Sequence, residues 1–182
     1  MSCTLTLGRK EPCKDTVGGL KAVYFTDFGD YGTVTETDDE ITDLTGTFTA
    51  FKYELKGNSS FEQAITSSRE NGTTFFDQTL TLTLKKLSKE DNKELKLLAY
   101  GRPHVAVEDY NGNVFVMGLQ HGAEVTGGSI STGASMDSLS GYSLTLNAQE
   151  VKPANFVNAP TAADPFAGMA SATVTVTEGT NS

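Results

Sequence analysis

The chain has 182 residues, 37% of them hydrophobic, and its 23 acidic and 14 basic side chains give a formal net charge of −9. This length suits one domain with a sizeable core, and no apolar run approaches the roughly 18 residues that span a bilayer. The sequence lacks the clustered Lys and Arg residues of proteins that bind duplex DNA tightly. Its net negative charge indicates either simple solubility or a surface that repels DNA.

The N-terminal part of the sequence alternates between strand candidates and polar segments. Residues 1–16 form a predicted arm with an isolated strand candidate at 3–7. The start of this arm lacks the basic and apolar segments of a signal peptide, so we expect a protein made in the cytoplasm. Residues 20–28 and 45–55 have the character of strands, and the acidic segment 36–40 between them is expected to be a solvated loop.

The middle of the sequence predicts a long hairpin. Residues 79–84 alternate Thr with Leu, which is the period of a strand with one buried face, and residues 59–68 are also extended. Asn71-Gly72 lies between them and favours the positive φ angles of a type I′ turn. Each arm of about ten residues would span roughly 33 Å, so we expect the hairpin to project past the domain and to contact a neighbouring molecule.

One helix is predicted over residues 89–100. Ser88 and Asp91 resemble a capping box, and apolar residues that include Leu95 and Leu98 follow at helical spacing. A glycine and a proline then come in the order that ends helices.

A second hairpin is predicted after the helix. Residues 104–108 and 114–119 flank Asn111-Gly112, again a dipeptide of tight turns. Residues 124–135 are rich in Gly, Ser and Thr, and form either a twisted strand or an ordered loop.

The C-terminal part of the sequence has a different composition. Residues 141–148 alternate and close a predicted domain that spans 17–152. Residues 153–182 carry three prolines, and we expect an extended arm that ends in an alternating strand at 172–177. That strand has one apolar face that needs cover, so we expect it to leave its own domain and pair with a neighbouring subunit. Folding back onto residues 3–7 of the same molecule is the alternative.

The reactive side chains form no catalytic pattern. His104 and His121 lack partners at the spacing of a triad or a metal site, and His104 is expected to pack at the corner between helix and strand. Glu108 and Asp109 are interpreted as a solvated shoulder of the second hairpin, since a sugar cleft between two carboxylates usually has aromatic platforms.

Two further groups could bind a metal or form a covalent link in principle. Cys3 and Cys13 are the only two cysteines, and we expect them to be reduced, with a disulfide as the alternative. Asp38, Asp39 and Glu40 lack the spaced ligands of a calcium loop. The sequence therefore predicts no enzyme, no bound metal and no cofactor.

The order of elements and several segments resemble the tail-tube family of bacteriophage virion proteins. The fold of that family is a small β-sandwich or barrel flanked by one helix. The resemblance covers roughly residues 17–157. The segments that carry it are 57–63 (GNSSFEQ), 67–73 (SSRENGT), 97–103 (LLAYGRP), 107–113 (VEDYNGN) and 140–146 (SGYSLTL).

This resemblance implies a mainly β fold, an antiparallel β-sandwich or barrel with two hairpins, one short α-helix and extended terminal arms. It also implies a non-enzymatic virion subunit, made in the host bacterium, that forms a hexameric tube or a ring, often dodecameric, with copies of itself. Other tail or neck proteins would be partners, DNA would pass through without specific binding, and no membrane would be involved. A head–tail connector ring and a host- or carbohydrate-binding β module are the alternatives.

Two groups of residues are expected at subunit interfaces, and a third group is expected to face the channel as acidic side chains. The first group is the hairpin tip, with Ser67, Arg69, Glu70, Asn71, Gly72 and Thr73; the second is the terminal strand, with Thr173, Val174, Thr175 and Val176; the third is Asp38, Asp39 and Glu40.

Overall fold

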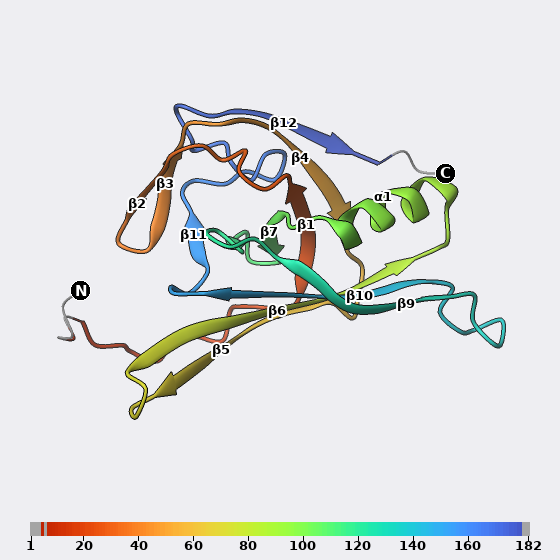
Figure 1. Cartoon of the computed structure of the whole chain (residues 1–182), viewed down its shortest axis with the longest axis horizontal. Coiled ribbons are helices and arrows are strands. Elements are labelled where there is room, and N and C mark those ends of the chain that lie inside the picture. Colours follow the sequence, from red (N-terminus) through yellow and green to blue (C-terminus); the bar gives the residue numbers. More distant parts are fainter. Residues whose placement is uncertain (1–4, 6, 180–182) are drawn as a thin grey trace.

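The structure is a computed structural model, and it describes residue 5 and residues 7–179 of the protein. These residues form two β-sheets and one helix, with 48% of the residues in strands and 7% in helix. Figure 1 shows the small sheet running beneath the large sheet, with the helix to one side. The prediction of a mainly β, sandwich-like fold is confirmed.

The two sheets differ in size. The large sheet has, in spatial order, β12 (Thr173–Glu178), β4 (Thr47–Glu54), β1 (Leu20–Thr26), β7 (His104–Asp109), β8 (Val114–Met117), β11 (Asn155–Val157), β3 (Glu40–Leu44) and β2 (Val34–Thr37). The small sheet has the order β5 (Ser60–Ser68), β6 (Thr73–Lys85), β10 (Gly141–Glu150) and β9 (Glu124–Ser131). The β12–β4 and β11–β3 pairs are parallel, so the large sheet is mixed and not purely antiparallel as predicted.

Strand β1 is buried on both faces, because a hydrophobic core covers each face of the large sheet at this strand. Val23 and Phe25 belong to the core between the two sheets, whereas Ala22 and Tyr24 belong to a second core on the opposite face. A strand with two covered faces needs no polar alternation, which explains its continuous apolar run.

The core between the sheets uses the predicted alternation of the long strands. Leu80 and Leu82 of β6 are fully buried there, together with Leu146 and Ala148 of β10, and Leu84 packs at the margin. Each leucine removed from water in this way contributes about 1.5–3 kcal/mol, so this layer holds the small sheet to the large one.

The second core is aromatic, and the large sheet curves around it. Apolar residues of β1, β3, β4, β7, β8 and β11 all meet in this one cluster. The ring centroid of Tyr31 lies 4.9 Å from that of Phe48 and 5.6 Å from that of Phe166. Phe166 and Met169 come from the segment between β11 and β12, so this segment closes the core.

The C-terminal region therefore differs from the predicted extended arm. The packed domain continues past residue 152, and the last strand, β12, pairs with β4 of the same molecule from Thr173–Thr47 to Glu178–Lys52. Asp43 of β3 also accepts hydrogen bonds from the backbone and the hydroxyl of Ser171, which ties the segment before β12 to the sheet. The aromatic core supplies the cover that the apolar face of this strand requires.

Helix α1 spans Lys89–Tyr100, as predicted. The Ser88 hydroxyl accepts the backbone N–H of Asp91 at 2.9 Å, which confirms Ser88 as the N-cap. Leu95 is buried, and Leu98 packs against the core between the sheets.

The N-terminal segment has no strand between residues 7 and 19. In the strand predicted at 3–7, Cys3 and residues 4 and 6 lie outside the described residues. Leu5 and Leu7 of that segment are exposed. The segment is anchored at Val17, whose backbone N–H and carbonyl bond to the side-chain amide of Asn111.

Candidate functional site

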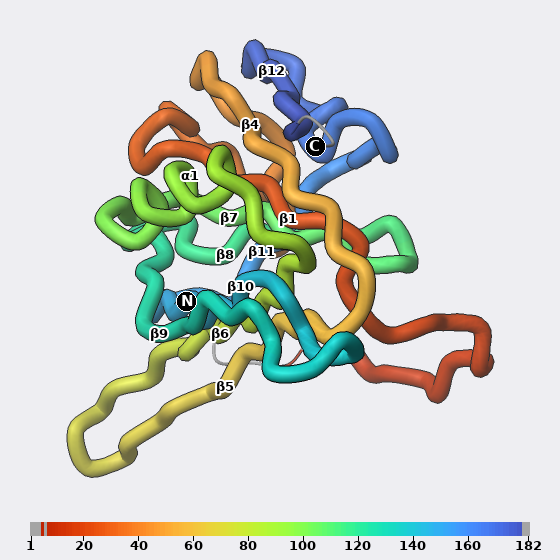
Figure 2. The backbone as a smooth tube through the Cα atoms, turned by 90° about the vertical axis from the view of Figure 1, so that its right-hand side faces the viewer, coloured from red at the N-terminus to blue at the C-terminus, as the bar shows by residue number. Residues whose placement is uncertain are grey.

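The β5–β6 hairpin projects from the body of the protein (Figures 1 and 2). Its strands pair without a register shift from Ser60–Thr81 to Ser68–Thr73, and no residue of β5 is buried. Counting from the tip, the first buried side chain of β6 is Gln78. About 16 Å of strand therefore extends past the core, at about 3.3 Å per residue. The predicted projection is confirmed, whereas contact with a neighbour stays a prediction.

The hairpin tip collects the first predicted group of interface residues in one place. Strand β5 ends at Ser68 and β6 begins at Thr73, so the loop has four residues, not the two of the expected type I′ turn. A type I′ turn needs positive φ at both central residues, and in this loop only Gly72, with φ +63°, has it. The hydroxyls of Ser67 and Thr74 lie 3.0 Å apart across the two strands.

The opposite end of the small sheet carries a second exposed projection. The loop 132–140 joins β9 to β10 there, and Ile130, Met136 and Leu139 are exposed around it. Because β10 pairs with β6 from Gly141–Lys85 to Glu150–Phe76, this loop and the hairpin tip lie at opposite ends of the sheet. The small sheet is thus longer than the core that it covers.

The outer face of the small sheet is polar. Residues that alternate with the buried leucines point to this face, and most of them carry hydroxyl groups. They include Ser60, Thr79, Thr81, Thr83, Ser129, Ser143 and Thr145. Its acidic groups are Glu62, Asp77 and Glu124, and Asn147 donates to Asp77 at 2.5 Å. Lys85 is at one end of this face.

Both edges of the small sheet are open among the described residues. β5 pairs with β6 alone and β9 pairs with β10 alone, and the four strands alternate in direction. An open edge presents unpaired N–H and C=O groups that can pair with another molecule.

The second predicted interface group lies on β12, at one edge of the large sheet. Thr173 and Thr175 are exposed, whereas Val174 and Val176 pack against the aromatic core. The expectation that this strand leaves its own domain is wrong in this structure, because β4 of the same molecule supplies a strand edge and the core covers the valines. The structure does not bring β12 together with the hairpin tip into one site. Whether its outer edge contacts another subunit stays a prediction.

The acidic triplet forms a tight turn and not the predicted loop. Asp38 and Asp39 have φ of +53° and +62°, the two positive values that a type I′ turn requires, and they join β2 to β3. Glu40 is the first residue of β3. The triplet borders a shallow groove of about 440 Å³ with Asn113 and Phe156. It lies on the large sheet, and its predicted position at a channel stays a prediction.

Glu108 is buried, with 4% of its surface exposed, and is not the solvated shoulder that the sequence predicted. The hydroxyl of Tyr24 donates to its carboxylate at 2.9 Å, and Lys21 forms an ion pair with it at 2.5 Å. Burial, together with the hydrogen bond to Glu108, raises the pKa of the Tyr24 phenol. The pairing of β1 with β7 brings these residues together across more than 80 positions, so no local pattern could reveal them.

Asp109 organises the β7–β8 turn. Its carboxylate accepts the backbone N–H groups of Asn111 and Asn113, each at 2.8 Å. Although partial burial opposes the shift, the hydrogen bonds from Asn113 and Asn111 lower the pKa of Asp109. The Asp109 N–H donates to the Asn113 carbonyl at 3.0 Å and so closes residues 110–112, with positive φ at Gly112, as a three-residue loop and not the two-residue type I′ turn expected.

His104 packs at the corner between α1 and β7, as predicted. Its Nδ1 lies 2.8 Å from the carbonyl of Gly118, and its Nε2 accepts the N–H of Gly29 at 3.1 Å, which defines a neutral ring. The ring stacks on Tyr31, with centroids 4.4 Å apart. Burial lowers the pKa of His104. This is a structural histidine.

His121 lies beside a buried carboxylate that the sequence did not indicate. Glu150 is 4% exposed and accepts the backbone N–H groups of Gln120 and His121, and its second oxygen lies 3.1 Å from Nδ1 of His121. These bonds hold the loop after β8 against the end of β10. Among the described residues, no group of three or more His, Cys, Asp or Glu side chains could hold a metal ion.

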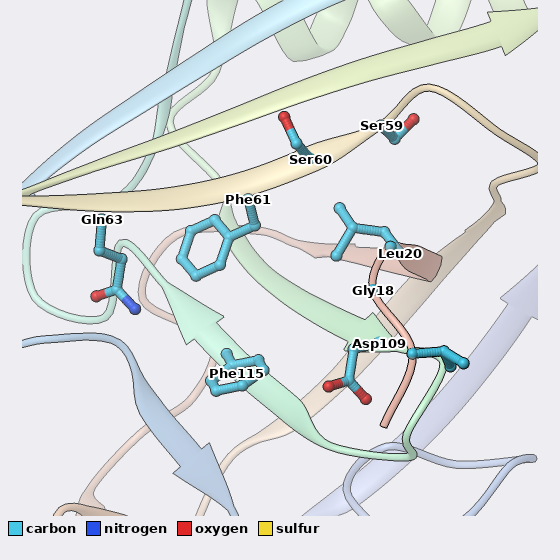
Figure 3. A pocket seen from close by; sticks show the side chains of 10 residues that line it. Gly18, Leu20, Ser59, Ser60, Phe61, Gln63, Asp109 and Phe115 are labelled. Atoms are coloured by element: carbon cyan, nitrogen blue, oxygen red, sulfur yellow. The ribbon is translucent and has the colours of Figure 1, made fainter. Parts of the chain in front are cut away.

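A groove of about 480 Å³ lies at the base of the hairpin (Figure 3). Phe61 of β5 and Phe115 of β8 face it from two sides with ring centroids 6.3 Å apart, and Leu20, Gln63 and Asp109 also line it. No nucleophile among its lining residues is paired with a base.

No protein-family model matches this protein, and no curated protein matches it. In the part of the molecule that the structure describes, no helix is long and apolar enough to cross a membrane. The geometry of the small sheet is therefore the main guide to function.

Proposed function

We propose that this protein is a non-enzymatic structural subunit of a bacteriophage particle that assembles with copies of itself into a ring or tube around a DNA channel. The observation that carries the proposal is the small sheet, which has two open edges and a projection at each end. The assignment to a phage particle rests on the resemblance of the sequence segments quoted above.

The directions of the strands favour a closed ring. β5 and β9 run in opposite directions, because they are the first and last of four alternating strands. Pairing β9 of one subunit with β5 of the next continues the alternation without a break. This contact joins two different surfaces, and such a contact closes into a ring when the rotation from one subunit to the next divides a full turn.

The outer face of the small sheet suits a channel for DNA. Hydroxyl groups cover most of it, and its acidic groups Glu62, Asp77 and Glu124 would repel phosphates. The net charge of −9 has the same sign. A channel of this kind lets DNA slide without sticking.

The two projections offer a way to stack rings. The hairpin tip of one subunit would reach the 132–140 end of a subunit in the next ring. Repeated stacking produces a tail tube, whereas a single ring with other proteins above and below produces a head–tail connector. The proposal covers both positions, and the tube is the first choice.

Microscopy and sedimentation of the purified protein test this proposal. We expect rings or tubes with a central hole in negative stain, and a concentration-dependent large species in analytical ultracentrifugation. Ile130→Lys places a charge on the edge strand β9 and should abolish the rings, because Lys blocks edge pairing. Leu97→Lys, at an exposed position of α1, is the matched control and should assemble normally.

Two results would count against the proposal. A wild-type protein that stays monomeric at high concentration removes the basis for a ring or tube. Rings that form equally well with Ile130→Lys would show that assembly does not use the edge of β9.

A further inference from the structure

The protein has two Asn-Gly pairs, each at an exposed hairpin turn, and the two asparagine side chains are held very differently. We propose that Asn71 is a site of spontaneous deamidation, which converts it to aspartate and isoaspartate, whereas the fold protects Asn111 from the same reaction. This inference does not depend on the proposed function.

The reaction needs only water and a mild base. Hydroxide removes the backbone amide proton of the following glycine, and that nitrogen attacks the amide carbon of the asparagine side chain. The new bond from nitrogen to carbon closes a five-membered succinimide, the bond from that carbon to the amide nitrogen of the side chain breaks, and ammonia leaves. Water then opens the ring at either carbonyl, which yields Asp or isoaspartate, and no oxidant or reductant takes part. Glycine in the second position favours the attack because it has no side chain to block it.

Asn111 cannot readily reach the geometry of attack. Its side-chain nitrogen donates to the Val17 carbonyl at 2.8 Å and to Asp109 at 3.3 Å, and its side-chain oxygen accepts the Val17 N–H at 3.1 Å. The nitrogen that would attack belongs to Gly112, and its N–H donates to the Asp109 carbonyl at 3.3 Å. Each of these bonds must break before the ring can form.

Asn71 is not held in this way. Its backbone N–H donates to the Ser68 hydroxyl at 3.3 Å, but within residues 7–179 its side-chain amide forms no hydrogen bond. The amide of Gly72 likewise has no hydrogen-bond acceptor there, and the space beside its Cα is open to 4 Å. Both residues are exposed, so hydroxide and water reach them. The Asn71 side chain is therefore free to rotate toward the Gly72 nitrogen.

The product would alter the tip of the hairpin. Aspartate adds a negative charge next to Glu70, and isoaspartate routes the backbone through the former side chain, which lengthens the four-residue loop. The change is confined to a segment that the core does not contact.

Peptide mapping tests the inference. The folded protein is incubated in mildly alkaline buffer, and samples are digested and analysed by mass spectrometry for the gain of about 1 Da that marks deamidation. We expect the peptide with Asn71 to react about tenfold faster or more than the peptide with Asn111, since several hydrogen bonds restrain the latter. In strong denaturant both sites should react at similar rates, because the hairpins are then lost.

Two variants isolate the cause. Asn71→Ser should remove the fast reaction. Asp109→Ala should accelerate the reaction at Asn111, and a melting curve shows whether this variant is folded. Equal rates at the two sites in the folded protein, faster reaction at Asn111, or no reaction at Asn71 would each overturn the inference. If Asp109→Ala does not fold, the comparison of native and denatured wild type still decides it.

Discussion

Shortening the β5–β6 hairpin separates assembly from folding. The change replaces residues 67–74 with Asn-Gly, so that Thr66 and Phe75 close a two-residue turn. These two residues already face each other in the register. The Thr66–Phe75 pair lies two positions along the strands from the Ser68–Thr73 pair. Hydrogen-bonded and non-hydrogen-bonded pairs alternate along an antiparallel ladder, so both pairs are of the same kind. The variant loses the whole predicted group of interface residues at the tip.

The structure predicts that this variant folds normally. None of residues 67–74 is buried, and their side-chain hydrogen bonds, between Ser67 and Thr74 and between Asn71 and Ser68, lie within the deleted segment. No buried group loses a partner, so the free energy of unfolding should change by less than about 0.5 kcal/mol. For a domain of this size that shifts the melting temperature by less than about 2 °C.

Assembly should respond quite differently. The hairpin extends about 16 Å past the core, and the deletion removes the outer part of this reach. We expect tubes or stacked rings to disappear in negative stain and the large species to be lost in sedimentation. A control with Asp38→Asn and Asp39→Gly alters another exposed hairpin turn without shortening it, and should assemble like the wild type.

Two outcomes would refute the reasoning. Assembly with an unchanged concentration dependence would show that the tip is not an interface. A fall of many degrees in the melting temperature of the monomer would show that the tip contributes to its own domain, contrary to its exposure.

Three further predictions concern stability. Phe166→Ala should lower the free energy of unfolding by about 3–5 kcal/mol in chemical denaturation, because Phe166 fills the aromatic core; a loss below about 1 kcal/mol would mean that this segment does not pack in solution. Burial raises the pKa of Tyr24 and of Tyr31, and it raises the pKa of Tyr53 to about 12. Above about pH 10 these tyrosines therefore lose protons in the unfolded protein but keep them in the folded protein. Stability should then fall by up to about 1.4 kcal/mol per tyrosine per pH unit, and a flat profile in urea titrations between about pH 10 and 12 would contradict this. Burial lowers the pKa of His104, so the free energy of unfolding should decline as the pH falls below about 6.5. If protonation of this ring causes the decline, His104→Gln should lessen it.

Elements that depend on neighbouring residues could be predicted from the sequence. The helix at Lys89–Tyr100 follows from the Ser88 cap and the apolar spacing, both of which operate within one or two turns. The long hairpin follows from the strict Thr-Leu alternation of residues 79–84, the extended residues 59–68 and the Asn-Gly turn signal between them. The projection of its tip also follows, because polar residues on both faces of two paired strands leave nothing to bury.

The types of the turns could not be predicted in the same way. Asn-Gly favours a type I′ turn, yet both Asn-Gly pairs lie in longer loops, and the turn with two positive φ values is Asp38-Asp39. In a hairpin the number of loop residues and the register of the strands must agree with each other. Register in turn depends on which side chains meet in the core, and a dipeptide carries no information about that.

Partners far apart in the sequence were decided by the tertiary structure alone. Alternation in residues 173–177 shows that one face of the last strand must be covered, but not that β4, more than 120 residues earlier, would do so. The burial of Glu108 likewise depends on Lys21 and Tyr24 of a distant strand. A residue pattern specifies the need for burial or for a charged partner, because that need is a property of the side chain itself. The identity of the partner emerges only when the sheets pack, because it depends on how every strand is arranged around the two cores.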